Sequence, residues 1–327
     1  MYFYLTGIDY KRAAIDLREA LYRHQHAVSV YWANTNPGGS AVLVTCNRLE
    51  IYGMAEYADD ASAHIAGFFK NFPDFSKYAY VKFKKECVFE HALRLASGLE
   101  SQIKGELQII EQLDAWRKNT AVPGPIKDLW DEAVILSQEI RAASNLNKHD
   151  YNIAAIVFDD IEKKMEGKEK YEILIIGTGK IAEVFAGYRA GRAHLTFVSH
   201  RNHQKARRMA EYSGGAALSS GSLIQIIAQS DIIIGATSSP HYVLKKEHLA
   251  ETPLRLRYPL YIYDLAMPRD VEPAVGEIGG VYLYNLDALE PLFSKHNKSL
   301  EASIELASNL IEDRLAAFQG AIHDKGY

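Results

Sequence analysis

Two kinds of hydrophobic periodicity occur in the first 145 residues. Alternating or continuous apolar runs bounded by polar residues predict short strands at 2–8, 41–44, 51–55 and 79–83. Apolar positions that recur every three or four residues predict helices at 15–31, 61–71, 86–118 and 126–144, the third interrupted near Gly98 and Gly105. Strands and helices that mix in this way are typical of an α+β domain.

The pattern changes after residue 150. A helix is expected at 152–165, and the apolar strands that follow are each succeeded by a helical stretch or a polar loop. These strands lie at 173–176 and 195–198 and within SDIIIGATSS and YPLYIYDLAMPRD. Such an alternation predicts a parallel sheet with helices on both faces.

One long amphipathic helix is predicted after Asn285, and it runs toward the end of the chain. Its apolar positions are Leu300, Ile304, Ala307, Ile311, Leu315 and Phe318. This stripe either packs against the same chain or faces a partner. The predicted fold class is therefore α/β, with an N-terminal α+β domain, a Rossmann-type parallel-sheet domain and a long C-terminal helix.

A glycine turn joins the strand at 173–176 to the next helix. The turn reads Gly177-Thr178-Gly179-Lys180-Ile181-Ala182, a GxGxxA motif between a strand and a helix. The first glycine permits a tight turn, and the second lets the backbone approach a pyrophosphate at the helix N-terminus. The motif and its context predict a dinucleotide site formed by residues 177–181.

The end of the following strand distinguishes between the two nicotinamide cofactors. An NAD site needs an acidic residue there for the ribose 2′-hydroxyl. This chain has Ser199 and Arg201, with Lys205 beyond, and these suit a 2′-phosphate. NADPH is therefore the expected cofactor, and a solvated basic turn is the alternative. The loops that contain Thr237 and Ser238 and residues 264–269 are expected to line the nicotinamide side.

Cys46 is one of only two cysteines, which are too few for a disulfide framework. It follows an apolar strand and is flanked by polar residues, and Arg48 could lower the pKa of its thiol. A thiolate together with a nicotinamide cofactor suggests attack on an activated acyl carbon and reduction of the resulting thioester. A structural cysteine is the rival interpretation.

The segment HALRLASGLESQIKGELQIIEQ, residues 91–112, is helical in pattern but contains two glycines that packing alone would not favour. Its polar residues Ser101, Glu106 and Gln108 stand among apolar ones. The segment is therefore either a substrate pocket or a kinked core helix with polar residues on its surface.

Composition excludes several classes of protein. The formal net charge of −4 means that nucleic acid would have to bind through local basic patches. No signal peptide and no run of about 20 apolar residues is evident, so we expect a cytoplasmic protein with no membrane association. The histidines have no thiol or carboxylate partners at ligand spacing, and no metal is expected.

Several motifs resemble the glutamyl-tRNA reductase family. TCNRLEIY, residues 45–52, is similar to the family signature, and residues 91–112 are similar to its HLxxxAxGLxSxxxGExQIxxQ segment. GIDYKRAAIDLRE, the glycine turn, SHRN, ATSSP and DLAMPRD also resemble family motifs and occur in the same order, over about residues 1–320.

The resemblance implies an enzyme that uses NADPH to reduce glutamyl-tRNA to glutamate-1-semialdehyde, the first step of tetrapyrrole synthesis by this route. It implies that Cys46 is the nucleophile and that His91 assists proton transfer or positions the ester. The residues expected to hold the glutamyl group are Thr45, Asn47, Arg48, Glu50, Ser101, Glu106 and Gln108. Among them, Arg48 is expected to meet the substrate carboxylate and Glu50 to orient Arg48.

The same resemblance implies three domains: a catalytic domain that recognises the glutamyl group and tRNA (1–150), an NADP-binding Rossmann domain (151–287) and the start of a dimerisation helix (288–327). The chain resembles a short form that lacks most of the family's C-terminal dimerisation domain. Implied partners are glutamyl-tRNA, the aminomutase that uses the product, and a second copy bound through the C-terminal helix. Two alternatives remain: a dehydrogenase of a small free carbonyl compound, and a non-catalytic regulator that binds tRNA, haem or a partner.

Overall fold

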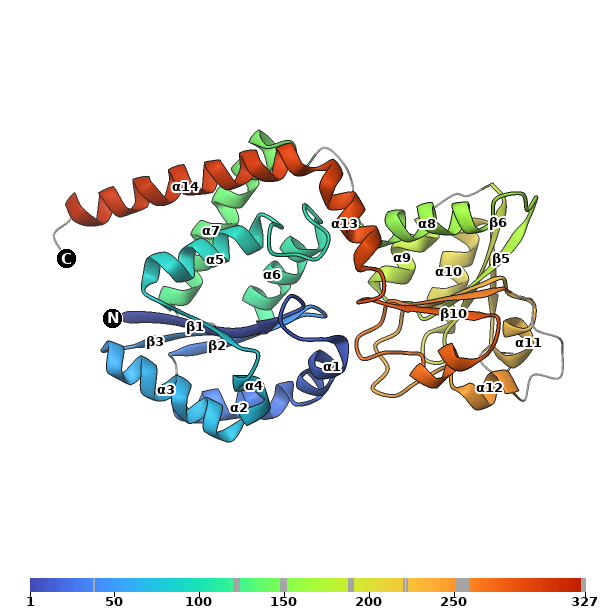
Figure 1. The fold of residues 1–327 in the computed structure, drawn as a ribbon, viewed down its shortest axis with the longest axis horizontal. Coiled ribbons are helices and arrows are strands. Elements are labelled where there is room, and N and C mark those ends of the chain that lie inside the picture. The colour runs from blue at the N-terminus through green and yellow to red at the C-terminus, as the bar shows by residue number, and fades with distance from the viewer. Residues whose placement is uncertain are drawn as a thin grey trace. The chain divides into compact units, whose positions relative to one another are not determined.

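The computed structural model describes residues 1–37, 39–119, 124–147, 152–187, 191–219, 221, 223–250 and 259–324, without the side chains of 119 and 317–324. The chain divides into two compact units, residues 1–152 with 293–327 and residues 153–292. Each unit has its own sheet (Figure 1). The assignment of functions to three domains stays a prediction. Within the described residues, no helix is both long and apolar enough to cross a membrane.

The first unit contains a four-stranded antiparallel sheet with the order β2-β3-β1-β4. Its strands are β1 (Tyr2–Asp9), β2 (Ser40–Val44), β3 (Arg48–Ala55) and β4 (Tyr80–Phe83). Its helices are α1 (Ile15–Arg23), α2 (Gln25–Thr35), α3 (Ala58–Asn71), α4 (Pro73–Ser76), α5 (Lys85–Ala96), α6 (Gln108–Asn119), α7 (Gly124–Ala143), α13 (Glu290–Ser299) and α14 (Glu301–Asp324). The predicted α+β character is confirmed.

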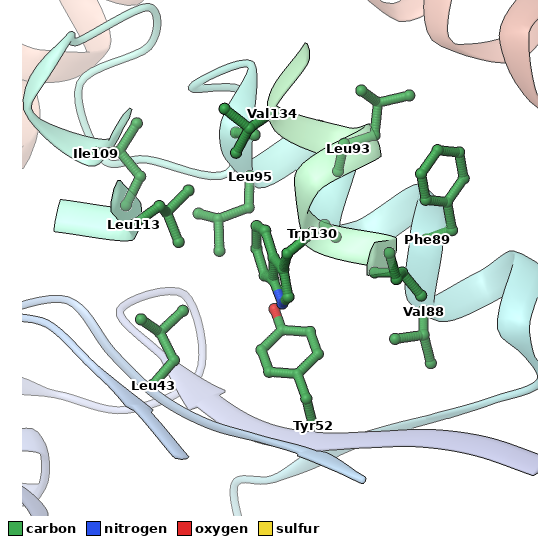
Figure 2. Packing of buried hydrophobic residues seen from close by; sticks show 14 of the residues in the cluster. Leu43, Tyr52, Val88, Phe89, Leu93, Leu95, Ile109, Leu113, Trp130 and Val134 are labelled. Atoms are coloured by element: carbon green, nitrogen blue, oxygen red, sulfur yellow. The ribbon is translucent and has the colours of Figure 1, made fainter. Parts of the chain in front are cut away.

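Both faces of this sheet are covered by helices, because successive side chains of a strand point to opposite faces. Phe3 and Leu5 belong to a core formed with α5, α6, α7 and α14, whereas Tyr4 and Ile8 belong to a second core formed with α1, α2 and α3. In the first core the rings of Tyr52 on β3 and Trp130 on α7 meet edge to face, with centroids 5.1 Å apart (Figure 2).

Three predicted helices are divided in the structure. The predicted helix at 86–118, expected to be interrupted near Gly98 and Gly105, consists of α5 and α6 with residues 97–107 between them. The other two divisions were not expected. The predicted helix at 15–31 consists of α1 and α2, and His24 is both the C-cap of α1 and the N-cap of α2. The predicted C-terminal helix consists of α13 and α14, which meet at Leu300. In both cases the apolar period continues across the break, so periodicity alone did not reveal it.

The apolar stripe of α14 packs against its own unit. Ala307 and Ile311 are fully buried in the core formed with α5 and α7, and Ile304 and Leu315 pack at its margin. The helix α14 lies against α5 and α7 (Figure 1). The own-chain alternative is therefore confirmed for the described part of the stripe, and the side chain of Phe318 lies outside the described residues. Dimerisation through the C-terminal helix stays a prediction.

The second unit is a six-stranded parallel sheet with the order β10-β9-β8-β5-β6-β7. Its strands are β5 (Tyr171–Ile176), β6 (Ala193–Val198), β7 (Ala216–Leu218), β8 (Ile232–Gly235), β9 (Leu260–Asp264) and β10 (Val281–Asn285). Its helices are α8 (Ile153–Lys164), α9 (Lys180–Gly187), α10 (His203–Ser213), α11 (Leu223–Ile227), α12 (Lys246–Ala250) and the short 3₁₀ helix η2 (Pro273–Glu277). This is the strand order of a Rossmann fold, and the order reverses between β5 and β8. The predicted parallel-sheet domain is confirmed.

Candidate active site

Cys46 lies at the tip of the hairpin that joins β2 and β3. The backbone N–H of Thr45 donates to the carbonyl of Arg48 at 2.9 Å, which leaves Cys46 and Asn47 as the two residues of the turn. The Thr45 hydroxyl accepts the N–H of Asn47 at 3.2 Å, and the carbonyl of Asn47 accepts the N–H of Tyr10 at 3.0 Å. The thiol is therefore carried by a turn whose backbone is tied to two strands.

A small cleft lies beside this turn and is lined by Ile8, Arg18, Leu21, Tyr22, Val44, Thr45, Cys46, Arg48 and Leu49. Its volume of about 10 Å³ is enough for roughly one water, so a larger ligand requires the cleft to open. Arg18 is buried and donates to the side-chain oxygen of Asn47 at 3.1 Å.

Arg48 lowers the pKa of the Cys46 thiol, as expected, but it does not hold Cys46 as a thiolate in the free protein. Burial, together with the negative charge of Glu106, raises the pKa of the Cys46 thiol to about 11. Arg18 and Arg48 oppose this rise without cancelling it. The resting form of Cys46 at neutral pH is therefore the thiol.

Arg48 is engaged by a buried acid. Its Nη1 donates to Glu50 Oε1 at 2.6 Å, and its Nη2 donates to the backbone carbonyl of Glu100 at 2.5 Å. The side chains of Arg48 and Glu50 are 1% and 0% exposed, so this ion pair has almost no contact with solvent. Glu50 orients Arg48, as the sequence analysis expected.

The carboxylate of Glu50 also accepts hydrogen bonds from three further side chains. Oε1 accepts from His91 Nε2 at 2.9 Å and from the Tyr80 hydroxyl at 2.5 Å, and Oε2 accepts from the Tyr52 hydroxyl at 2.6 Å. Burial alone would raise the pKa of Glu50, but the charges of Arg48 and His91 outweigh it and hold the pKa well below its usual range. His91 Nε2 thus contacts Glu50, and its role in proton transfer stays a prediction.

The two glycines in the segment 91–112 shape a loop between α5 and α6. Gly98 and Gly105 have φ angles of +79° and +76°, a region that disfavours residues with a side chain. A Cβ on Gly98 would lie 3.2 Å from the Cα of Gly105 and 2.9 Å from Arg141 Nη1. The buried guanidinium of Arg141 donates to the carbonyls of Ser97, Gly105 and Glu106 and closes the base of the loop.

Two predicted substrate residues lie in or next to this loop, residues 97–107, and make few hydrogen bonds. Gln108 Nε2, on the first residue of α6, is buried without a hydrogen bond among the described residues, and the Ser101 hydroxyl interacts with the carboxyl of Glu106. Ser101 lies beside the carboxyl of Glu106, whose pKa is raised by burial. Buried polar atoms normally have partners, so these atoms suit contact with a bound polar ligand.

Several residues of the site were not identified from the sequence. Tyr10 donates through its hydroxyl to the carbonyl of Ser101 at 3.1 Å, and Glu100 accepts from Lys11 at 2.5 Å and Arg94 at 3.1 Å. Arg18 and Arg141 were also not identified from the sequence. The sequence signals were weak: Arg18 lies within the quoted stretch GIDYKRAAIDLRE, but nothing in its spacing connects it with Cys46.

The glycine turn of the second unit lies where the strand order reverses. Gly177 has a φ of +119°, and a Cβ there would lie 2.4 Å from the carbonyl oxygen of Ala236, which follows β8. Gly179 carries no side chain, so a ligand can approach the backbone just before the first turn of α9. Ala182 within that turn is fully buried. This cradle fits the pyrophosphate of a dinucleotide, which binds at a helix N-terminus.

The predicted cofactor residues after β6 differ in their surroundings. The Ser199 hydroxyl accepts the N–H of Asn202 at 3.1 Å and lies 3.5 Å from the Thr178 hydroxyl. Arg201 is exposed, and Lys205 pairs with Glu183 at 2.6 Å. Lys205 would therefore have to leave Glu183 to meet a 2′-phosphate.

The loop after β8 is held by a carboxylate from the loop after β9. Asp270 accepts the backbone N–H of Thr237 at 2.8 Å and its hydroxyl as well, and Ser238 beside it is exposed. Burial raises the pKa of Asp270 to about 6. Thr237 is thus fixed at the edge of the sheet where nicotinamide-type ligands bind in this fold.

The strand order and glycine turn of the second unit, joined to an α+β unit with a cysteine at a hairpin tip, define a two-domain oxidoreductase of the Rossmann type. The family described as "Glutamyl-tRNAGlu reductase, N-terminal domain" matches residues 6–144, and that described as "Shikimate / quinate 5-dehydrogenase" matches residues 159–292. The chain is similar to glutamyl-tRNA reductases over both of its units.

Individual relatives agree over almost the whole chain. A glutamyl-tRNA reductase of Carboxydothermus hydrogenoformans is 28% identical, covering 97% of this chain and 74% of its own length. One of Methanococcoides burtonii is 32% identical, covering 84% of this chain and 65% of its own length. The solved glutamyl-tRNA reductase of Methanopyrus kandleri is 25% identical with a TM-score of 0.51, covering 98% of this chain and 80% of that one. The shikimate match is confined to the nucleotide-binding unit, so the alternative of a free-carbonyl dehydrogenase is supported only by a shared fold.

Proposed function

We propose that the protein uses NADPH to reduce glutamyl-tRNA to glutamate-1-semialdehyde through a thioester on Cys46. The observation that carries this proposal is the position of Cys46 at a hairpin tip, near the buried polar side chains of Ser101 and Gln108, in a chain that is similar to glutamyl-tRNA reductases. The role implied is the first step of tetrapyrrole synthesis from glutamate.

In the proposed first step, the Cys46 sulfur attacks the carbonyl carbon of the glutamyl ester. The bond to the tRNA ribose oxygen breaks, that oxygen takes a proton, and a thioester remains on Cys46. The resting thiol must lose its proton for this attack. The positive α-ammonium group of the bound glutamyl residue, added to Arg18 and Arg48, favours the thiolate when the substrate is present.

The remaining polar groups would hold the glutamyl residue. Gln108 Nε2 has no hydrogen bond among the described residues, Ser101 Oγ interacts with the carboxyl of Glu106, and this partly buried carboxyl suits an ammonium group. Thr45 and Asn47 shape the turn, and Arg48 holds the loop through the Glu100 carbonyl.

The second unit would hold the cofactor. Residues 177–181 fit the pyrophosphate, and Ser199 with Arg201 would meet the 2′-phosphate that distinguishes NADPH. When bound, the reduced nicotinamide supplies a hydride for the thioester carbon. The carbonyl oxygen takes a proton, and breakage of the carbon–sulfur bond then releases the aldehyde and restores Cys46.

A single-turnover experiment tests the thioester. Glutamyl-tRNA charged with labelled glutamate is mixed with the wild type or Cys46→Ser, with and without NADPH, and the label is followed. We expect label on the wild-type protein without NADPH and in the semialdehyde with it, and neither with Cys46→Ser. Label that stays on tRNA in every wild-type reaction would refute the proposal, and the regulator alternative would then gain.

A further inference from the structure

Two buried carboxylates lie at and beyond the carboxyl end of β9 in the second unit. Asp264 and Asp270 are 1% and 0% exposed. A Cβ added to Gly235, the last residue of β8, would lie 3.2 Å from an oxygen of each, so both carboxylates lie against the same residue. Burial, together with the negative charge of Asp270, raises the pKa of Asp264 to about 7. Burying two carboxyl groups side by side is unfavourable, and such arrangements are concentrated at functional sites.

The first of these carboxylates, Asp264, fixes the backbone that carries the second. Its Oδ1 accepts the N–H groups of Ala266 at 3.2 Å and Asp270 at 3.1 Å. Its Oδ2 accepts the N–H of Val271 at 2.9 Å. Each of these donors belongs to the loop after β9, so Asp264 sets the position of Asp270 within that loop.

The side chain of Asp270 in turn fixes the loop after β8. Its Oδ2 accepts the backbone N–H of Thr237 at 2.8 Å, and its Oδ1 accepts the Thr237 hydroxyl. The same hydroxyl accepts the backbone N–H of Ser239 at 2.9 Å. The single proton of the Thr237 hydroxyl is thus used within the protein, and the backbone is held on both sides of Ser238.

Ser238 differs from both of its neighbours. Its side chain is exposed, and among the described residues its hydroxyl has no hydrogen-bond partner. The loop begins where the strand order reverses: the N–H of Ala236 donates to the carbonyl of Ile176 at 2.9 Å, and a Cβ on Gly177 would meet the carbonyl of Ala236. In this fold the crevice at the reversal point receives the cofactor. A hydroxyl on a fixed backbone at this place suits contact with a polar ligand.

We propose that Asp270 is a positioning residue for the nicotinamide half of the cofactor, because it holds Ser238, through Thr237, where the Ser238 hydroxyl contacts the nicotinamide nucleoside. This deepens the function proposed above and rests on it. Thr237 and Ser238 were both expected to line the nicotinamide side, and the hydrogen bonds give them different tasks. The proton of the Thr237 hydroxyl is engaged by Asp270, whereas the Ser238 hydroxyl is exposed. Asp264 contributes by holding the backbone of Asp270.

Two ligands separate the halves of the cofactor in a calorimetric binding experiment. NADPH carries the nicotinamide nucleoside, whereas ADP with a 2′-phosphate has the adenosine and pyrophosphate alone. We expect Asp270→Asn to weaken NADPH binding by roughly 10- to 100-fold and to change binding of the shorter ligand little. Thr237→Val, which removes the hydroxyl, should act in the same direction, and Thr237→Ser should restore NADPH binding. Glu277→Gln removes an exposed carboxylate of the same unit and, as the matched control, should change neither affinity.

An equal loss of affinity for both ligands in Asp270→Asn would show a merely structural role and overturn the proposal, as would an unchanged affinity for NADPH. A wild type that binds NADPH no more tightly than the shorter ligand would also overturn it. The double variant of Asp270→Asn and Thr237→Val should lose little more than Asp270→Asn alone, because both changes remove one hydrogen bond; additive losses would contradict the link. A wild type that binds NADPH but does not reduce glutamyl-tRNA would refute the proposed function, whereas the two affinities alone decide the role of Asp270.

Discussion

Replacing Glu50 with glutamine tests how far the buried ion pair stabilises the first unit. Glutamine keeps the shape of the side chain but removes the charge that faces Arg48 at 2.6 Å. The guanidinium would then remain buried with a neutral partner. Its second hydrogen bond, to the Glu100 carbonyl, supports the loop 97–107, so the loss would extend beyond the pair itself.

The expected magnitude follows from the burial. Removing one partner of a fully buried pair costs about 3–5 kcal/mol, and the retained amide oxygen places Glu50→Gln near the lower value, about 3 kcal/mol. For a unit of this size such a loss lowers Tm by about 6–12 °C. The surface variant Glu139→Gln removes an exposed pair with Arg314 and should cost less than about 1 kcal/mol.

Because the pKa of Glu50 is shifted, the stabilisation by the Glu50–Arg48 pair should depend on pH. The folded-state pKa lies well below the unfolded value, so the stabilisation is fully present above about pH 4.3 and is lost as the pH falls below it. The difference in the free energy of unfolding between wild type and Glu50→Gln should therefore decrease by about 1.4 kcal/mol per pH unit below about pH 4.3.

Tryptophan fluorescence is the suitable assay, because Trp32, Trp116 and Trp130 all belong to the first unit. Urea unfolding followed at pH 7 and near pH 3.5 gives the two free energies of unfolding that the comparison needs. A Glu50→Gln midpoint equal to that of Glu139→Gln would refute the reasoning, and so would a difference from wild type that does not change between the two pH values.

Three further outcomes are expected. Gly98→Ala should destabilise the first unit by about 1–3 kcal/mol, because the φ angle of Gly98 is positive and an added Cβ would contact Gly105. In the control Gly124→Ala the added Cβ meets no neighbour, and equal unfolding midpoints for the two variants would contradict the prediction. Arg201→Ala should raise KM for NADPH by roughly 10- to 100-fold with little change for NADH; a parallel rise for both would assign Arg201 another role. Iodoacetamide should alkylate Cys46 more slowly than exposed Cys87 near pH 8, since the pKa of the Cys46 thiol is about 11. Peptide mass spectrometry follows the labelling of both cysteines, and faster labelling of Cys46 would contradict the raised pKa.

Local patterns predicted most of the fold because each strand and helix buries one face or both against a core. The run at 173–176 is a fully buried central strand, and its continuous apolar sequence reflects that position. The break at His24 could not be predicted, because the residues on either side keep helical character and only tertiary packing turns the chain. The same holds for the junction between α13 and α14.

The sequence predicted which residues form the site better than it predicted which of their side chains interact. The stretch around Cys46 and the segment 91–112 were both singled out, but residues 97–107 were expected to be a kinked helix and form a loop. The positive φ angles of Gly98 and Gly105 explain why glycines interrupt that segment. The protonation of Cys46 was predicted wrongly because sequence proximity to Arg48 suggested a thiolate. Burial and the distant residue Glu106 dominate instead, and neither can be read from adjacent positions.

The buried pair with Glu50 limits what Arg48 can do for an incoming anion. The charge of Arg48 is balanced by Glu50 within a nearly solvent-free pair, so pairing Arg48 with a substrate carboxylate would require that bond to be shared or broken. Arg48 also holds the loop that carries Ser101, because its Nη2 donates to the Glu100 carbonyl. Losing Arg48 should therefore reduce stability and activity together.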